Sequence, residues 1–234
     1  GPQVGRLLQA DPGGANLDIH IAQTQGELGY LLLAELPDSL CVLTRAVIDG
    51  AAGPPVKPVG PVLTVQPTDG SPTVAAGSGW RIIVPSPQPA EIPETAVIGE
   101  LLEHRHVIAA GGGGIPINRQ GQPISGVVDK DWAASLLARN LDAALLVFAT
   151  SVDAVYSRFD SREPARHDQL HSAQARELIE QGEAAPGSMA PKLESAADFA
   201  DATGRDAVIC SLREIEAAID GGVGTRIVPS RRAL

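Results

Sequence analysis

The apolar positions of the N-terminal part of the chain recur at helical spacing. Leu17, Ile21, Leu28, Leu31 and Leu32 follow this spacing. The pattern predicts one long helix over residues 17–36, which ends at Pro37. A short buried strand is expected over residues 40–44.

Residues 46–92 lose this periodicity and are dense in glycine and proline. Only 61–65 and 80–84 resemble strands. A disordered linker is one interpretation of such a stretch. Two apolar islands flanked by turn residues instead favour a small hairpin-like excursion from the main body.

Strand-like and helical segments alternate in the rest of the chain. Strands are predicted over 107–110, 144–150, 207–211 and 225–228, and helices over 95–103, 128–139, 172–181 and 191–202, with one more before the last strand. The strands are continuously apolar, which indicates that both faces of the sheet are covered. The sequence therefore predicts an α/β fold with a mainly parallel sheet between helical layers.

Composition and charge exclude several classes of function. The longest apolar run, 143–149, is too short to span a bilayer, which argues against a membrane protein. A formal net charge of −10 with scattered arginines argues against a nucleic-acid surface. Cys41 and Cys210 lie in apolar runs without CxxC spacing, which favours buried free thiols in a reducing cytosol over a disulfide or a zinc site.

Loops after the strands are the places to search for chemistry, because ligands of α/β sheets collect at the carboxyl ends of strands. Four glycines, 111–114, could approach a ligand closely and direct N–H groups at an anion, or could form a flexible turn. The chain has no GxxxxGK[ST] motif, so a bound nucleotide would be held by other means. The loop 151–156 could be an ordinary turn with a half-buried tyrosine.

The loop 187–192 precedes an amphipathic helix. Leu193, Ala196, Ala197 and Ala200 form its inward stripe. Pro191 suits a first helical turn, and the free N–H groups of that turn, next to Lys192, favour an anion.

Lysine is rare in this chain, since only Lys57, Lys130 and Lys192 stand among 18 basic residues. An ammonium group is a compact and mobile point charge, whereas guanidinium is a rigid fork. Mobile charges suit a phosphoryl group that moves during transfer, although compositional drift toward arginine is an alternative explanation.

Together these segments resemble the carbamate kinases, and the resemblance covers essentially the whole chain. The matching motifs, all in family order, are GPQVG (1–5), AQTQG (22–26) with Gly29 and Tyr30, KPVGP (57–61), GWR (79–81), VPSP (84–87), GGGG (111–114), VDKD (128–131), VDAVY (152–156), GSM (187–189), Pro191 with Lys192, and Gly224 with Thr225. The resemblance implies the three-layer αβα fold of the amino acid kinase superfamily, a homodimer, and reversible phosphoryl transfer between ATP and carbamate. It also implies Mg²⁺ held mainly by nucleotide phosphates, and a cytoplasmic role in arginine fermentation.

The resemblance further implies three parts: a carbamate lobe (1–45 and 93–140), a protruding lid (46–92) and a nucleotide lobe (141–234). Lys130 and Lys192 would grip the phosphoryl group from either side, Asp131 would lie between them, and Lys57 would bring a third charge on the lid. Other site residues are Gly1, Gly111, Gly112, Gly113 and Gly114 for phosphate, and Thr150, Ser151, Asp153, Tyr156, Ser188 and Met189 for the nucleotide.

No general base is needed, because carbamate is already anionic and nucleophilic. No dedicated metal site is expected either, and His104 and His106 are better explained by a helix-to-strand junction. Arg158 is expected to matter little for turnover.

The chain also departs from the family pattern. It lacks the first strand and the Gly-Gly-Asn loop, roughly the first fifth of a typical member, so we expect the sequence to be part of a longer polypeptide. The lid is also shorter than usual between Pro61 and Gly79. Two alternatives stay open: a sibling kinase of the superfamily, and a non-catalytic nucleotide-binding module.

Overall fold

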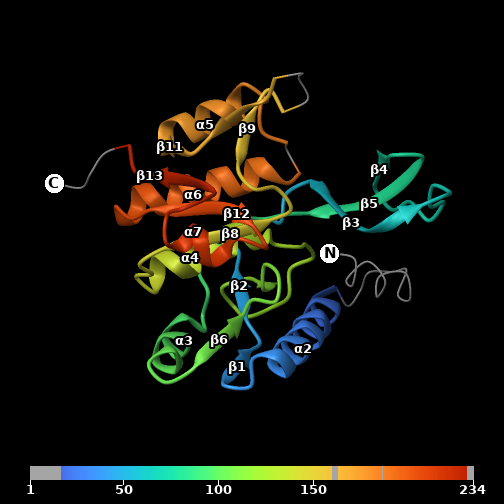
Figure 1. Cartoon of the computed structure of the whole chain (residues 1–234). Helices are drawn as coiled ribbons and strands as arrows, with labels where there is room; N and C mark the ends of the chain where they lie inside the picture. Colours follow the sequence, from blue (N-terminus) through green and yellow to red (C-terminus); the bar gives the residue numbers. More distant parts are fainter. Residues whose placement is uncertain (1–16, 160–162, 186, 231–234) are drawn as a thin grey trace. The chain divides into compact units, whose positions relative to one another are not determined.

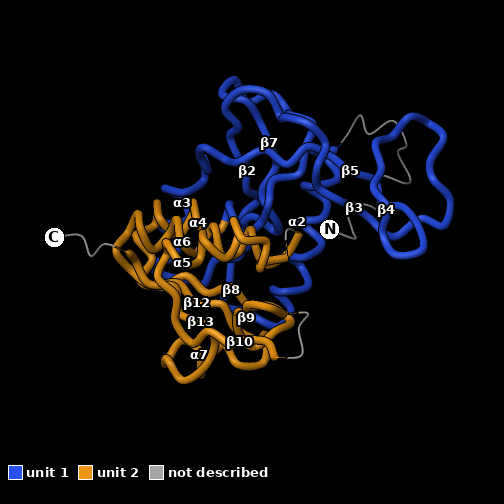
Figure 2. The backbone as a smooth tube through the Cα atoms, turned by 90° about the horizontal axis from the view of Figure 1, so that it is seen from above, with its two compact units in different colours: residues 1–133 blue, residues 134–234 orange. Residues whose placement is uncertain are grey.

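The computed structural model describes residues 17–159, 163–185 and 187–230 (Figure 1). The chain forms two compact units, residues 1–133 and 134–234 (Figure 2). Their boundary falls inside one helix, α4 (Lys130–Asn140). Gly1 lies outside the described residues.

The first unit is built on two parallel strand pairs and two further helices. These elements are α2 (Leu17–Glu35), β1 (Ser39–Val42) with β6 (His106–Ala109), β2 (Arg45–Val47) with β7 (Ile115–Ile117), and α3 (Thr95–Leu102). The long first helix is confirmed. The strand expected over 40–44 is shorter and not buried, since Leu40 is 40% exposed and the chain begins a second strand at Arg45.

A separate antiparallel sheet of three strands follows β2. Its order is β3 (Pro55–Leu63), β5 (Gly79–Pro85) and β4 (Thr73–Ala76). The interpretation of this stretch as a disordered linker is therefore wrong, and β3 begins earlier than the pattern indicates. Val59, Ile82 and Val84 pack with Leu17 and Ile21 of α2, which attaches the sheet to the unit.

The second unit contains a four-stranded sheet in the order β11 (Gln169–His171), β13 (Thr225–Val228), β12 (Ala207–Ser211) and β8 (Leu146–Thr150). Two neighbouring pairs in this sheet are parallel: β11 with β13, and β12 with β8. The central pair, β12 with β13, is antiparallel. Its remaining elements are the hairpin of β9 (Val155–Ser157) and β10 (Ala165–His167), and helices α5 (Ser172–Glu180), α6 (Met189–Thr203) and α7 (Ile215–Ile219).

Alternation along β12 explains why its sequence is continuously apolar. Ala207 and Ile209 pack with Leu193 and Phe199 of α6, whereas Val208 and Cys210 pack with Ala218 of α7. Side chains on a strand point to opposite faces in turn, so both sets are buried only when helices cover both faces. The prediction of an α/β fold with helical layers on both sides of a sheet is confirmed.

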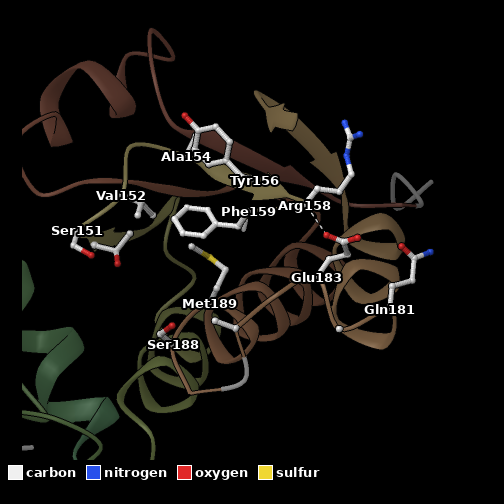
Figure 3. A pocket seen from close by; sticks show the side chains of 13 residues that line it. Ser151, Val152, Ala154, Tyr156, Arg158, Phe159, Gln181, Glu183, Ser188 and Met189 are labelled. Atoms are coloured by element: carbon white, nitrogen blue, oxygen red, sulfur yellow. Dashed lines mark hydrogen bonds between the residues drawn. The ribbon is translucent and has the colours of Figure 1, made fainter. Parts of the chain in front are cut away.

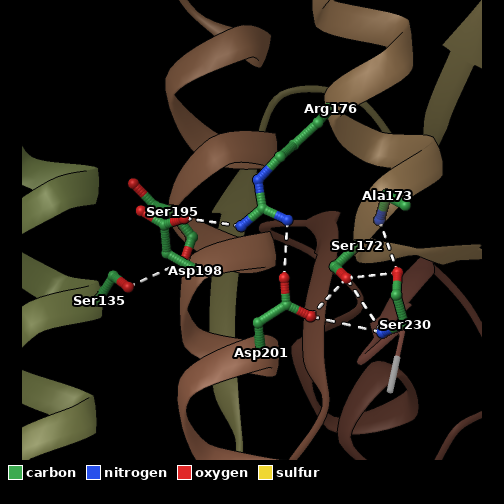
Figure 4. Close-up of polar contacts among 8 residues, drawn as sticks. All are labelled: Ser135, Ser172, Ala173, Arg176, Ser195, Asp198, Asp201 and Ser230. Atoms are coloured by element: carbon green, nitrogen blue, oxygen red, sulfur yellow. Dashed lines mark hydrogen bonds and ion pairs between the residues drawn. The ribbon is translucent and has the colours of Figure 1, made fainter.

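An ionic cluster joins α5, α6 and the segment after β13 (Figure 4). The guanidinium of Arg176 lies 2.9 Å from Asp198 and 2.7 Å from Asp201. The hydroxyl of Ser172 donates to Asp201 at 2.5 Å and accepts the N–H of Ser230 at 3.0 Å. These contacts attach the segment after β13 to helices α5 and α6.

Both cysteines are free thiols, as predicted. Cys210 is fully buried in β12, whereas Cys41 in β1 is only half-buried. Within 17–159, 163–185 and 187–230, no helix has both the length and the apolar composition that a membrane crossing needs.

Candidate active site

Asp129 fixes the start of α4. Its Oδ1 accepts the N–H of Asp131 at 2.9 Å, and its main-chain oxygen accepts the N–H of Ala133 at 3.1 Å. A carboxylate in this position satisfies an N–H group that the first helical turn leaves without an intrahelical partner. The prediction that VDKDW opens a helix is thus confirmed, and the first aspartate of the motif is its cap.

Lys57 of β3 is held by the same aspartate. Its Nζ lies 2.6 Å from Oδ2 of Asp129 and 3.5 Å from the carbonyl oxygen of Val128. The side chains of Lys57 and Asp129 are only 23% and 14% exposed. Burial lowers the pKa of Lys57, although the charge of Asp129 opposes this shift. Burial would raise the pKa of Asp129, but the charge and hydrogen bond of Lys57 outweigh burial, so the pKa of Asp129 is lowered.

Lys130 and Asp131 occupy the first turn of α4. Asp131 is buried, with 4% of its surface exposed, whereas the side chain of Lys130 is 61% exposed. The Nζ of Lys130 lies 3.4 Å from Oδ2 of Asp131. The unit therefore brings together the two lysines and two carboxylates of the 57 and 128–131 segments.

The glycine loop packs against this helix start. A Cβ on Gly113 would lie 2.1 Å from the carbonyl oxygen of Val128, and one on Gly111 would lie 2.8 Å from Gln25. Gly112 has φ +133° and Gly114 has φ +85°, in the region that side chains disfavour. Close approach to neighbouring atoms at Gly111 and Gly113, and a positive φ at Gly112 and Gly114, explain why the loop consists of glycine.

Not all N–H groups of this loop are available to a ligand. The N–H of Gly111 donates to Ala109 at 2.8 Å, and that of Gly114 donates to Ala110 at 3.2 Å. Gly112 and Gly113 are the two glycines of the loop whose N–H groups make no such bond within the described part of the chain. An anion at the loop would therefore be held by these two.

A buried amide network fixes the entry to the loop. The side chain of Gln25 donates to the Thr44 carbonyl at 2.9 Å and accepts the Thr44 N–H at 2.8 Å. The hydroxyl of Thr44 in turn accepts the N–H of Ala110 at 2.8 Å. The AQTQG motif thus contributes to the site indirectly, by holding the backbone where the glycines begin.

Lys192 belongs to the second unit, where it lies in the first turn of α6 and is 6% exposed. Leu193, Ala196, Ala197 and Ala200 are fully buried, so the predicted inward stripe of this helix is confirmed. The expectation that Asp131 separates Lys192 from Lys130 stays a prediction.

The second unit contains a cavity of about 860 Å³ (Figure 3). Its volume falls within the roughly 300–1,000 Å³ of small-molecule sites. The lining residues are Thr150, Ser151, Val152, Ala154, Tyr156, Arg158, Phe159, Gln181, Gly182, Glu183, Ala185, Ser188 and Met189. Of the six residues expected to bind a nucleotide, only Asp153 is absent from the wall.

Asp153 instead supports a residue of the wall. Both of its carboxylate oxygens accept the Tyr156 hydroxyl, at 3.2 Å, and Oδ2 also lies 3.2 Å from Arg166. Burial and this carboxylate raise the pKa of Tyr156. Tyr156 and Phe159 pack edge to face with ring centres 6.2 Å apart, and Met189 points toward Phe159 (Figure 3).

Arg158 lies in the wall of this cavity, and the expectation that it matters little for turnover stays a prediction. Arg158 lines the cavity, has φ +54°, and donates its N–H to the carboxylate of Glu183. Left-handed backbone at a residue other than glycine is uncommon and clusters at functional sites. No pattern in the sequence indicates this conformation. No pattern indicates either that Phe159, Gln181 and Glu183 line the cavity.

Metal-binding side chains do not cluster in the described residues. No group of three or more His, Cys, Asp or Glu side chains there is placed to hold a metal ion. His104 lies between α3 and β6 and His106 is the first residue of β6, at the helix-to-strand junction that the sequence predicts.

Comparison with known proteins adds to this geometry. Residues 26–211 match the amino acid kinase family. The chain is 34% identical to a carbamate kinase of Halobacterium salinarum, over 98% of this chain and 83% of that protein. It is also similar to carbamate kinase from Giardia lamblia bound to citric acid, with a TM-score of 0.86 and 31% identity over 98% of this chain and 82% of that one. The structure of the same enzyme bound to AMP-PNP gives a TM-score of 0.84 at 31% identity. This match covers 98% of this chain and 83% of that one.

Proposed function

Because the chain belongs to the amino acid kinase family and falls among its carbamate kinases, we propose that it transfers a phosphoryl group reversibly between ATP and carbamate. Carbamoyl phosphate and ADP are the other pair of reactants. The observation that carries this function is the similarity to carbamate kinases along 98% of the chain. The chain is therefore a kinase.

Phosphoryl transfer requires alignment and charge neutralisation more than covalent participation by side chains. Lys57 and Lys130 supply two positive charges beside the glycine loop, and the N–H groups of Gly112 and Gly113 would bind oxygens of carbamate or of the moving phosphoryl group. The role of Lys192 as the opposing clamp, with Asp131 between the lysines, rests on the family resemblance.

Carbamate needs no general base, because it enters the reaction as an anion. Asp131 is accordingly proposed to orient lysines rather than to accept a proton. The lid carries Lys57 on β3 and would exclude water from carbamoyl phosphate, which hydrolyses readily.

The cavity of the second unit is proposed as the nucleotide site. Tyr156 and Phe159 provide aromatic surface of the kind that a base stacks on, and Ser188 and Met189 complete the wall at the start of α6. The expectation that free N–H groups of this turn bind an anion is wrong for the described residues, because the N–H groups of Ser188, Met189 and Ala190 donate to the Ala185 carbonyl oxygen. The AMP-PNP complex of the Giardia lamblia enzyme supports an adenine nucleotide as the ligand.

Magnesium is proposed to enter with the nucleotide. Mg²⁺ usually keeps several waters and binds through phosphates with one or two carboxylates. The described residues hold no group of three or more metal-binding side chains, so an ion of this kind would take most of its ligands from phosphates and water. A homodimer and a role in arginine fermentation are further proposals that follow from the family.

The test supplies ADP, Mg²⁺ and carbamoyl phosphate and measures ATP, with a reaction lacking the protein as the control. ATP formation at a rate proportional to protein concentration is the expected result. Parallel reactions that contain ATP and either an amino acid or a nucleoside monophosphate test the sibling kinases. Turnover with one of these acceptors and none with carbamoyl phosphate would contradict the proposed substrate, and no turnover at all would favour a binding module.

A further inference from the structure

Asp129 connects two segments of the first unit that lie far apart in sequence. Its Oδ1 accepts the N–H of Asp131 at the start of α4, at 2.9 Å, while its Oδ2 lies 2.6 Å from Nζ of Lys57 on β3. One carboxylate thus joins the strand that carries Lys57 to the helical turn that carries Lys130 and Asp131.

The contacts of Lys57 also orient its ammonium group. An ammonium has three N–H donors. One is directed to Asp129, and a second points toward the carbonyl oxygen of Val128 at a longer 3.5 Å. Val128 is also the residue against which Gly113 packs, so the Lys57 ammonium lies beside the glycine loop.

We propose that Asp129 is a positioning residue of phosphoryl transfer, which acts by holding the Lys57 ammonium beside the glycine loop. This inference rests on the proposed function. Both oxygens of Asp129 are engaged, one by Lys57 and the other by the α4 backbone, which assigns Asp129 to positioning rather than to substrate binding. Its contribution is to keep one positive charge where the transferring phosphoryl group develops negative charge.

The sign of its effect on kinetic constants follows from its own charge. A carboxylate near an anionic substrate weakens ground-state binding, whereas a correctly placed Lys57 stabilises the transition state. Loss of the Asp129 charge should therefore lower kcat without raising the KM for carbamoyl phosphate. A variant that is merely less well folded would not show this split.

The decisive variant is Asp129→Asn, because asparagine caps a helix about as well as aspartate but carries no charge. We expect the helix cap to be kept, a melting temperature lowered by the loss of the Lys57–Asp129 ion pair, and a kcat about 10- to 100-fold lower, the size of effect that slight misplacement of a reacting group produces. Asp129→Ser, which also caps, should behave in the same way. In a Lys57→Met background Asp129→Asn should have no further effect on kcat, as required of a residue that acts through Lys57.

A second readout does not depend on activity. The chain has only three lysines, so reductive methylation with ¹³C gives few resonances, which Lys→Arg variants can assign. Asp129→Asn should lower the pKa of Lys57, because burial remains while the attracting charge is lost. This measurement separates the two claims, since it works even in a chain that makes no ATP.

Three results would overturn the inference. These are an unchanged Lys57 resonance in Asp129→Asn, an equal loss of kcat with and without Lys57, and a raised KM accompanied by a lower melting temperature. Absence of ATP formation by the wild-type chain, together with a shifted Lys57 resonance, would instead refute the proposed function and leave the Lys57–Asp129 coupling standing.

Discussion

The Cα of Gly113 lies so close to Val128 that a Cβ at position 113 would come within 2.1 Å of the Val128 carbonyl oxygen. The obstacle is backbone rather than a side chain that could rotate away. The glycine loop and the residue before the α4 cap therefore touch main chain to main chain. This contact sets the distance between the loop N–H groups and Lys57.

Gly113→Ala is accordingly expected to displace the loop from the helix start. Overpacking of this kind typically costs about 1–3 kcal/mol, so the free energy of unfolding should fall by that amount. Turnover should fall even under conditions where the variant is fully folded, because the N–H groups of Gly112 and Gly113 move with the loop. Urea unfolding and initial rates of ATP formation measure the two effects.

Gly26→Ala is the matched control. Gly26 lies in the interior of α2 and is exposed, and a Cβ added there would meet no atom within 4 Å. Alanine is favoured over glycine in a helix by about 0.5–1 kcal/mol, so this variant should be slightly more stable and fully active. A Gly113→Ala variant that resembles it would contradict the close contact.

Much of the fold could be predicted from periodicity alone. The strand β12 is predicted by its continuously apolar run, and the helix α2 by the spacing of its apolar residues, although only Leu17 and Ile21 of that predicted stripe are buried and Leu31 and Leu32 are exposed. Short strands such as β2, β7 and β9 could not be predicted. Three residues are too few to show a period, and their positions are determined by pairing with partners distant in sequence.

The candidate site is predictable in its residue types but not in its contacts. The rarity of lysine draws attention to Lys57 and Lys130. Nothing in the sequence indicates that Asp129, rather than Asp131, is the partner of Lys57, because that pair joins positions 72 residues apart. The contact of the Arg158 N–H with Glu183 escapes prediction for a similar reason, since the two positions lie 25 residues apart.

Lys130→Met and Lys192→Met are each expected to lower kcat about 100- to 1,000-fold, as for loss of one group that stabilises transition-state charge. Methionine keeps most of the side-chain volume, which matters for the buried Lys192. Arg105→Met is the control, since Arg105 is exposed and its guanidinium donates to the carbonyl oxygen of its neighbour His104. Wild-type rates in both lysine variants would refute their roles, provided that circular dichroism shows intact folds.

The pH dependence of turnover should report Lys57. Its pKa lies below the ordinary 10.5, chiefly because of burial, and the charges of Asp129, Lys130 and Asp131 act on it. Since the ammonium form is the one required, turnover should decline at a lower pH than an ordinary lysine would give. Lys57→Arg stays protonated, so it should move this alkaline limb to higher pH. An unmoved limb would exclude Lys57 as the titrating group.

Tyr156→Leu and Phe159→Leu should each raise the KM for ADP about 3- to 10-fold, corresponding to the roughly 0.5–1.5 kcal/mol of an aromatic contact. The KM for carbamoyl phosphate should not change. Tyr156→Phe is the conservative control: it keeps the ring and loses only the hydrogen bonds to Asp153. If the leucine variants bind ADP normally, the nucleotide lies outside this cavity.

Asp201 should contribute stability that depends on pH. Burial opposes its ionisation, but hydrogen bonds from Ser172, Arg176 and the Ser230 N–H outweigh burial, so the pKa of Asp201 is lowered (Figure 4). A carboxyl group with a lower pKa in the folded state stabilises the fold above its unfolded pKa, near 3.8, and loses this effect as pH falls through the folded value. Because the Asp201 side chain is 37% exposed, solvent screens these contacts, and Asp201→Asn should lower the free energy of unfolding by at most about 1 kcal/mol at pH 7.

The difference between wild type and Asp201→Asn should shrink as pH falls below the unfolded pKa near 3.8, and should vanish once the folded carboxyl is neutral too. Asp49→Asn is the control, because Asp49 pairs with Arg119 at the surface, with both side chains more than half exposed. Exposed pairs contribute only about 0–1 kcal/mol, and salt screens them. A loss in Asp201→Asn that is the same at pH 7 and at acid pH would show that shape, not charge, makes the cluster stable.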